Sequence, residues 1–129
     1  MSARILLVDD EPALLKLTNR YLSRLGYDVE CCTSADAAWR RFEAAPSSYS
    51  LLLVDMTIAG MSAEELFRKV LGAKPDVHLI ACSGYAMDME DLQVEGKERI
   101  LFLQKPFAPA VLAEMVQALL TSEKNKIGN

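Results

Sequence analysis

Short apolar runs alternate along this chain with longer segments whose apolar residues recur every three or four positions. The run at 5–8 has no polar interruption, which is typical of a strand buried on both faces. In the segment that follows, leucines form one stripe of a helix that begins near Pro12 and stops at Gly26. The alternation predicts strands at 4–8, 28–32, 49–54, 77–81 and 100–103, and helices at 12–25, 34–45, 62–71, 86–96 and 110–120.

Five strands, each followed by a helix, predict an α/β fold with a doubly wound parallel five-stranded sheet. Ser34 and Ser62 are placed to cap the second and third helices. The prediction of a helix at 86–96 is based on a polar segment whose apolar residues include Leu92 and Val94. The pattern ends near residue 120, so we expect one domain at 1–122 and a frayed tail at 123–129.

Composition narrows the classes of protein to consider. The chain has 129 residues and a net charge of −4 from 18 acidic and 14 basic residues, so one domain is expected and nucleic acid is not an expected partner. No apolar run could span a bilayer and the N-terminus is not a signal peptide, so we expect a cytoplasmic protein without direct membrane contact. The three cysteines have no zinc-site spacing and are expected to be small buried thiols.

In a parallel sheet of this type, ligands bind beyond the carboxyl ends of the strands. The residues at those positions combine carboxylates, a hydroxyl and an ammonium. They are Asp9, Asp10 and Glu11 after the first strand, Asp55 after the third, Ser83 and Gly84 after the fourth, and Lys105 and Pro106 after the fifth. Clustered carboxylates without His or Cys suit a hard divalent cation, above all Mg²⁺, which commonly binds phosphate oxygens as well.

Asp55 stands alone at the end of a central strand, and a carboxylate oxygen can attack phosphorus to form an acyl phosphate. Mg²⁺ held by Asp9 and Asp10, together with Lys105, would neutralise charge on the transferred group. Ser83 can donate a hydrogen bond to a phosphoryl oxygen, and the adjacent glycine leaves space for a bulky donor. The combination predicts a phosphoryl-transfer site.

Each of these residues also has an ordinary structural explanation. Asp10 is suited to cap the first helix, Ser83 to cap a helix or turn, and Asp55 to a loop. Lys105 belongs to a residue type that is usually solvated. The functional interpretation therefore depends on their combination at one edge of the sheet.

The segments "ILLVDDEP", "GYDVECCTSADAAW", "LLLVDM", "LIACSGYA" and "FLQKPF" together resemble the receiver domain of two-component response regulators, over residues 4 to about 120. The combination of the motifs "CSGYA" and "FLQKPF" is most similar to the receiver domains of hybrid sensor histidine kinases. The resemblance implies a flavodoxin-like (βα)5 fold with strand order 2-1-3-4-5. It also implies two kinds of partner: a histidine kinase or other phosphohistidine donor, and a downstream phosphotransfer or effector protein.

The resemblance assigns Asp55 as the phosphoacceptor and Lys105 as the lysine that contacts the phosphoryl group. It assigns the Mg²⁺ ligands as Asp9, Asp10, Asp55 and the backbone carbonyl of Thr57. It implies self-catalysed phosphotransfer and slow autodephosphorylation, not the activity of a metabolic enzyme.

Further roles follow from the same resemblance. Ser83 and Phe102 form a switch that alters the face made by the fourth helix, the fifth strand and the last helix. Thr57, Gly84 and Tyr85 modulate access and phosphoryl lifetime, although Tyr85 fits a surface aromatic equally well. The Lys105–Pro106 peptide bond is expected to be cis.

The chain departs from the family pattern after Asp55, where Ile58-Ala59 replaces the usual Met-Pro and Ala63 stands where Gly is common. Loss of the proline predicts a less rigid loop and a changed phosphoryl lifetime. A docking module that is no longer phosphorylated is therefore the alternative hypothesis. A small α/β enzyme is a third hypothesis, disfavoured because the chain has no G-x-G-x-x-G motif and no P-loop.

Overall fold

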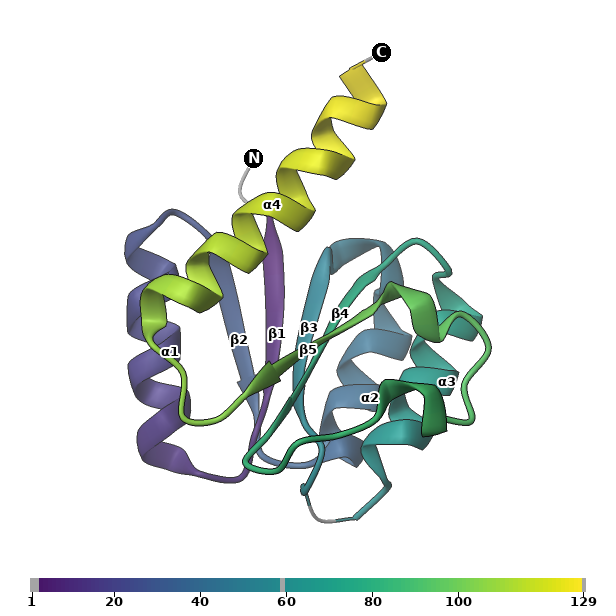
Figure 1. Cartoon of the computed structure of the whole chain (residues 1–129). Helices are drawn as coiled ribbons and strands as arrows, with labels where there is room; N and C mark the ends of the chain where they lie inside the picture. The colour runs from purple at the N-terminus through teal and green to yellow at the C-terminus, as the bar shows by residue number, and fades with distance from the viewer. Residues whose placement is uncertain (1–2, 59, 129) are drawn as a thin grey trace.

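The computed structural model describes residues 3–58 and 60–128, with side chains as far as Thr121. Except in the segment 84–99, its elements follow the predicted alternation, with shifts at their ends (Figure 1). The strands are β1 (Arg4–Val8), β2 (Asp28–Cys32), β3 (Leu51–Asp55), β4 (His78–Ser83) and β5 (Ile100–Gln104). The helices are α1 (Pro12–Arg24), α2 (Ala35–Ala44), α3 (Ala63–Ala73) and α4 (Pro109–Gly128), with 3-10 turns η1 (Pro46–Ser48), η2 (Met89–Asp91) and η3 (Lys97–Arg99).

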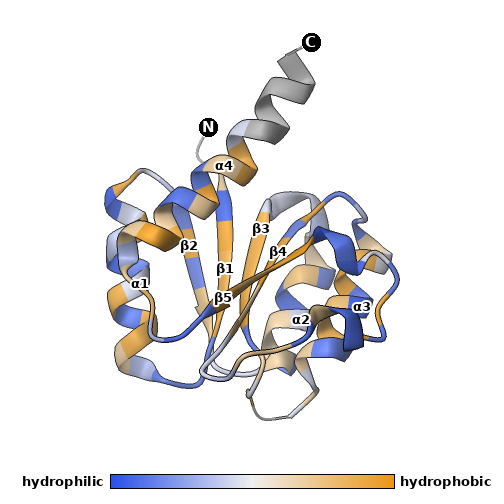
Figure 2. Ribbon diagram, viewed as in Figure 1, coloured by the Kyte–Doolittle hydropathy of each residue, from blue (hydrophilic) through white to orange (hydrophobic). Residues whose placement is uncertain are grey.

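The five strands form one parallel sheet in the order β2-β1-β3-β4-β5, which confirms the predicted flavodoxin-like topology. Successive side chains of a strand point to opposite faces of a sheet. In β1, Leu6 and Val8 accordingly enter one apolar core while Ile5 and Leu7 enter the other. The first core is covered by α2 and α3, and the second by α1 and α4. Apolar colour therefore dominates β1 beyond its first residue in Figure 2, whereas β2 at the sheet edge also shows hydrophilic colour.

The helix ends are capped largely as the sequence predicts. Ser34 Oγ accepts a hydrogen bond from Ala37 N–H, and Ser62 Oγ accepts one from Glu65 N–H, each at 3.1 Å. Asp10 does not cap α1, because the N-cap residue is Glu11 and it makes no side-chain capping bond. The last helix continues past its predicted end at residue 120, so the tail expected at 123–129 is helical as far as Gly128.

The prediction of a helix at 86–96 is wrong. Within the described residues 84–99 the chain forms no α-helix, only η2 and η3 (Figure 1). Leu92 and Val94 are both buried in the core beneath α2 and α3. A spacing of two residues puts both side chains on one side of an extended chain, but on different sides of a helix. Burial of this pair therefore favours the extended form.

Polar contacts hold the segment 84–99 against α3 and against the residues just before β4. The backbone of Gln93 is held at both groups: its N–H donates to Glu64 Oε2 at 3.0 Å, and its carbonyl accepts from Arg68 at 2.8 Å. Arg99 donates to the carbonyls of Asp76 and Val77 at 2.7 and 3.3 Å. The two bonds of Gln93 satisfy backbone groups that a helix would have paired internally.

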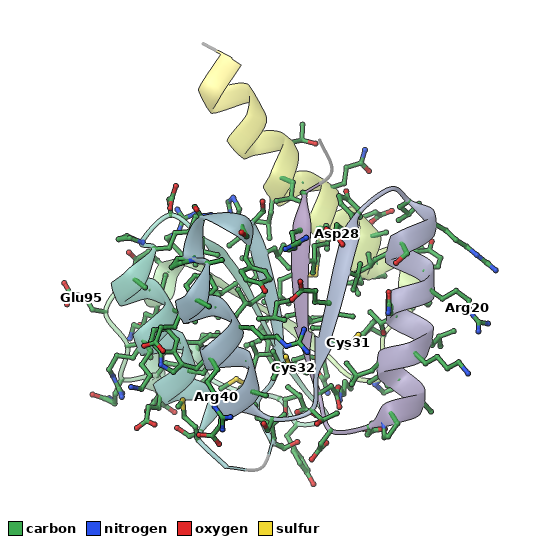
Figure 3. All side chains as sticks on the ribbon, turned by 180° about the vertical axis from the view of Figure 1, so that it is seen from behind. Arg20, Asp28, Cys31, Cys32, Arg40 and Glu95 are labelled. Carbon is green, nitrogen blue, oxygen red and sulfur yellow. The ribbon has the colours of Figure 1, made fainter. Side chains whose placement is uncertain are left out.

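All three cysteines are free thiols. Cys31 and Cys32 lie side by side in sequence on β2, as Figure 3 shows from behind, and point to opposite faces of the sheet. Burial raises the pKa of each of the two thiols, and raises the pKa of Cys82 to about 12. The thiols are therefore protonated and act as small apolar side chains. Among the described helices, none is long and apolar enough to cross a membrane.

The first prediction tests how the segment 84–99 is held. Leu92→Ala is expected to lower the free energy of unfolding by about 2–5 kcal/mol, because it removes buried methyl groups and leaves a cavity. Gln93→Ala is the matched control: its side chain is exposed and the contacts of the residue are through its backbone. Its effect is expected to stay within about 0.5 kcal/mol. Urea unfolding of both variants is the measurement, and equal losses would contradict the packing of Leu92.

Candidate functional site

The residues singled out from the sequence meet at the carboxyl edge of the sheet, at the lower end in Figure 1. Asp55 and Ser83 are the last residues of β3 and β4, and Asp9 and Lys105 directly follow β1 and β5. The parallel ladder continues through the backbone of this edge: Asp9 N–H donates to Cys32 O at 3.1 Å and Lys105 N–H donates to Ser83 O at 2.7 Å. The backbone positions of the site are therefore set by the sheet itself.

Lys105 joins the two buried carboxylates. Its Nζ donates to Asp9 Oδ2 at 2.7 Å and to Asp55 Oδ2 at 2.9 Å, and it lies 3.5 Å from Glu11 Oε1. Burial alone would lower the pKa of the Lys105 ammonium, but the bonds to both aspartates outweigh it and the pKa is raised. Lys105 is therefore a fixed positive charge between two strands, and the Lys105–Pro106 peptide bond is cis.

Asp55 is the most fully bonded carboxylate of the site. Its Oδ1 accepts the N–H of Thr57 at 2.9 Å and the Thr57 hydroxyl at 2.8 Å, while its Oδ2 accepts from Lys105. Burial, with only 4% of the residue exposed, would raise its pKa, but these bonds to Thr57 and Lys105 prevail and lower it. Asp55 is accordingly held as a carboxylate.

Asp9 differs from Asp55 in its environment. It accepts from Lys105 and, through Oδ1, from Glu11 N–H at 2.9 Å. Burial raises the pKa of Asp9, and the nearby charge of Asp55 adds to that effect, while the bonds from Lys105 and Glu11 only partly offset it. The two aspartates therefore share one lysine but have pKa values displaced in opposite directions.

Three carboxylates of this edge could share one cation. Oxygens of Asp9, Glu11 and Asp55 lie within 4.8 Å of one another. Hard oxygen donors at such spacing fit Mg²⁺. With all three ionised, their charge exceeds that of Lys105 by two, which one divalent cation would neutralise. The sequence assigned Asp9, Asp10 and Asp55, but Asp10 is exposed and outside this group, whereas Glu11, within the same acidic run, is inside it.

An open cleft lies over Asp55. Its polar lining comes from Glu11, Thr57, Tyr85 and Lys105, and its apolar wall from Leu14, Pro106 and Phe107. Tyr85 lines the cleft, and 74% of the residue is exposed. Gly84 lines the cleft beside Tyr85. A Cβ added at this glycine would meet nothing within 4 Å.

Neither of the two expected switch residues lines the cleft. Ser83 is buried, and its Oγ accepts the N–H of Tyr85 at 3.1 Å. Phe102, in the edge strand β5, is half-buried against the core beneath α2 and α3. Since the predicted fourth helix is absent from the described residues, the face expected to contain it is made by the extended segment 84–99, β5 and α4.

Comparison of the structure with solved proteins finds close matches over its full extent. The response regulator receiver domain protein (CheY-like) from Methanospirillum hungatei JF-1 matches with a TM-score of 0.85 and 26% identity, covering 98% of this chain and 99% of that one. The receiver domain of the hybrid histidine kinase CckA matches with a TM-score of 0.78 and 28% identity, covering 92% and 99%.

Curated relatives are longer proteins. Regulatory protein VanRB of Enterococcus faecalis is 29% identical over 120 residues, which are 93% of this chain and 53% of that protein. Sensor kinase CckA of Brucella abortus is 30% identical over 122 residues, 95% of this chain but 13% of the kinase. The chain thus spans about half of the first relative and a small part of the second.

The family defined as response regulator receiver domain matches residues 5–117, which include every site residue described above. The match spans all five strands and the first three helices. The chain therefore belongs to the response regulator receiver domain family, the receivers of two-component signalling.

Proposed function

We propose that this domain takes a phosphoryl group from the phosphohistidine of a histidine kinase onto Asp55, with Mg²⁺, and signals to a downstream phosphotransfer or effector protein. The observation that carries the proposal is the Asp55 carboxylate at the base of an open cleft, bonded to Lys105 and Thr57. An Asp55 oxygen forms a bond to phosphorus while the bond from phosphorus to the donor imidazole nitrogen breaks, and that nitrogen keeps the electron pair.

The charges of the site support transfer to Asp55. Phosphoryl transfer depends on positioning and on cations near the equatorial oxygens of the transferred group. Lys105 supplies one positive charge 2.9 Å from Asp55 Oδ2. Thr57 fixes the other oxygen of the same carboxylate through two hydrogen bonds. The nucleophile is thus oriented before a donor arrives.

Mg²⁺ would supply the remaining positive charge at the transferred oxygens. We propose Asp9, Asp10, Asp55 and the Thr57 backbone carbonyl as its ligands, with Glu11 as a further candidate because of its place beside Asp9 and Asp55. Ser83 and Phe102 are the proposed switch, which responds to the phosphoryl group and changes the face made by the segment 84–99, β5 and α4. Slow autodephosphorylation of Asp55 returns the domain to its starting state.

The second prediction concerns the acceptor. Incubation with acetyl phosphate and Mg²⁺ is expected to add one phosphoryl group, measured by intact mass. Asp55→Asn keeps the size of the side chain and removes the nucleophilic carboxylate, so no gain is expected. EDTA is expected to abolish the gain in the unaltered protein. No gain in the unaltered protein, with Mg²⁺ binding intact, would instead favour the docking module that is not phosphorylated.

The third prediction assigns the metal ligands. Asp10→Asn is expected to weaken Mg²⁺ binding roughly tenfold or more, because it keeps an oxygen but removes the negative charge that a hard divalent cation prefers. Glu11→Gln is expected to have a smaller effect, because the Glu11 side chain is 65% exposed and its ion pair with Lys105 is long, at 3.5 Å. Isothermal titration with MgCl2 on both variants is the measurement. The reverse order would transfer the ligand role from Asp10 to Glu11.

A further inference from the structure

The chain after Asp55 is held by two sets of contacts, one near Asp55 at 56–58 and one farther along at 60–61. On the near side, Ile58 is buried in the core beneath α2 and α3, and Met56 N–H donates to Cys82 O at 2.8 Å. On the far side, Met61 N–H donates to Asp36 Oδ2 at 3.2 Å. Asp36 lies in the first turn of α2, distant in sequence, and nothing in the local sequence around Met61 predicts this bond.

Gly60 fits closely against the same carboxylate. Its φ is +85°, a conformation that side chains rarely adopt, and a Cβ built on it would lie 2.5 Å from Asp36 Oδ2. A larger residue would therefore push the carboxylate away from Met61 N–H. The approach of backbone to carboxylate depends on the absence of a side chain at this position.

We propose that Asp36 is a positioning residue for the phosphoacceptor site: its carboxylate binds the N–H of Met61, in the space that the absent side chain of Gly60 leaves, and thereby fixes Thr57. Thr57 binds Asp55 Oδ1 through two hydrogen bonds and is separated from Met61 by only a few residues. A shift of the Gly60–Met61 anchor moves the Thr57 backbone, and with it the carbonyl proposed as a Mg²⁺ ligand. This inference rests on the proposed function of the site.

The test compares four variants with the unaltered protein. Asp36→Ala removes the acceptor, whereas Asp36→Asn keeps an oxygen that can accept Met61 N–H. Gly60→Ala displaces the carboxylate. Gly26→Ala is the matched control for backbone strain, because Gly26 also has positive φ, +99°, but a Cβ there would meet nothing within 4 Å. For each protein we would measure the thermal midpoint, the Mg²⁺ Kd by calorimetry, and the rate of phosphoryl gain from acetyl phosphate.

We expect Asp36→Ala and Gly60→Ala to raise the Mg²⁺ Kd roughly tenfold and to slow phosphoryl gain, at a temperature where every protein is folded. Asp36→Asn should restore the Mg²⁺ Kd to near that of the unaltered protein. Gly26→Ala should lower the thermal midpoint and leave the Mg²⁺ Kd unchanged.

A merely structural role for Asp36 would give a different result. Asp36→Ala and Gly60→Ala would then lower the thermal midpoint as Gly26→Ala does, with an unchanged Mg²⁺ Kd, and that outcome would overturn the proposal. Failure of the unaltered protein to gain a phosphoryl group would refute the proposed function, whereas the ratios of Mg²⁺ Kd among the variants would still decide the role of Asp36.

Discussion

The ammonium of Lys105, held between the carboxylates of Asp9 and Asp55, is the interaction on which this edge of the sheet depends. Two buried carboxylates on adjacent strands repel each other, and Lys105 lies within 2.9 Å of both. Removing one member of such a buried group leaves an uncompensated charge, at a cost of about 3–5 kcal/mol. The three charged side chains therefore stabilise this edge only together. The two carboxylates of Asp9 and Asp55 carry two negative charges, and Lys105 neutralises one of them.

That charge arrangement is available only because the sheet aligns the strand ends. Asp55 is in register with Cys82, and Ser83 with Gln104, so Lys105 follows directly beside the end of β4. Backbone bonds beyond the strands, from Asp9 to Cys32 and from Lys105 to Ser83, extend the same register by one residue. The register of the parallel strands therefore sets the distance between groups that are up to 96 residues apart in the chain.

These relationships explain which features the sequence predicts well. Strands apolar on both faces predict a parallel sheet, and the carboxyl-edge rule then brings Asp55, Ser83 and Lys105 together without further information. The contact of Asp36 with Met61 is not predictable in this way, because it joins the first turn of α2 to the loop before α3, and the relative position of the two comes from the packing of α2 on α3. The helix predicted at 86–96 failed because its assignment rested on polar composition, whereas Leu92 and Val94 have the spacing of an extended chain.

The extended segment also changes how Ser83 is connected to the rest of the domain. A helix after β4 would move as one body, because its hydrogen bonds are internal. Here the chain beyond Ser83 is instead held by separate contacts: two buried side chains, the Glu64 and Arg68 bonds to Gln93, and the Arg99 bonds to Asp76 and Val77. Glu64 lies in the first turn of α3, which begins soon after the chain leaves Asp55. The loop that carries Thr57 leads into α3, and the segment that follows Ser83 is bonded to side chains of the same helix, so α3 contacts both segments that leave the site.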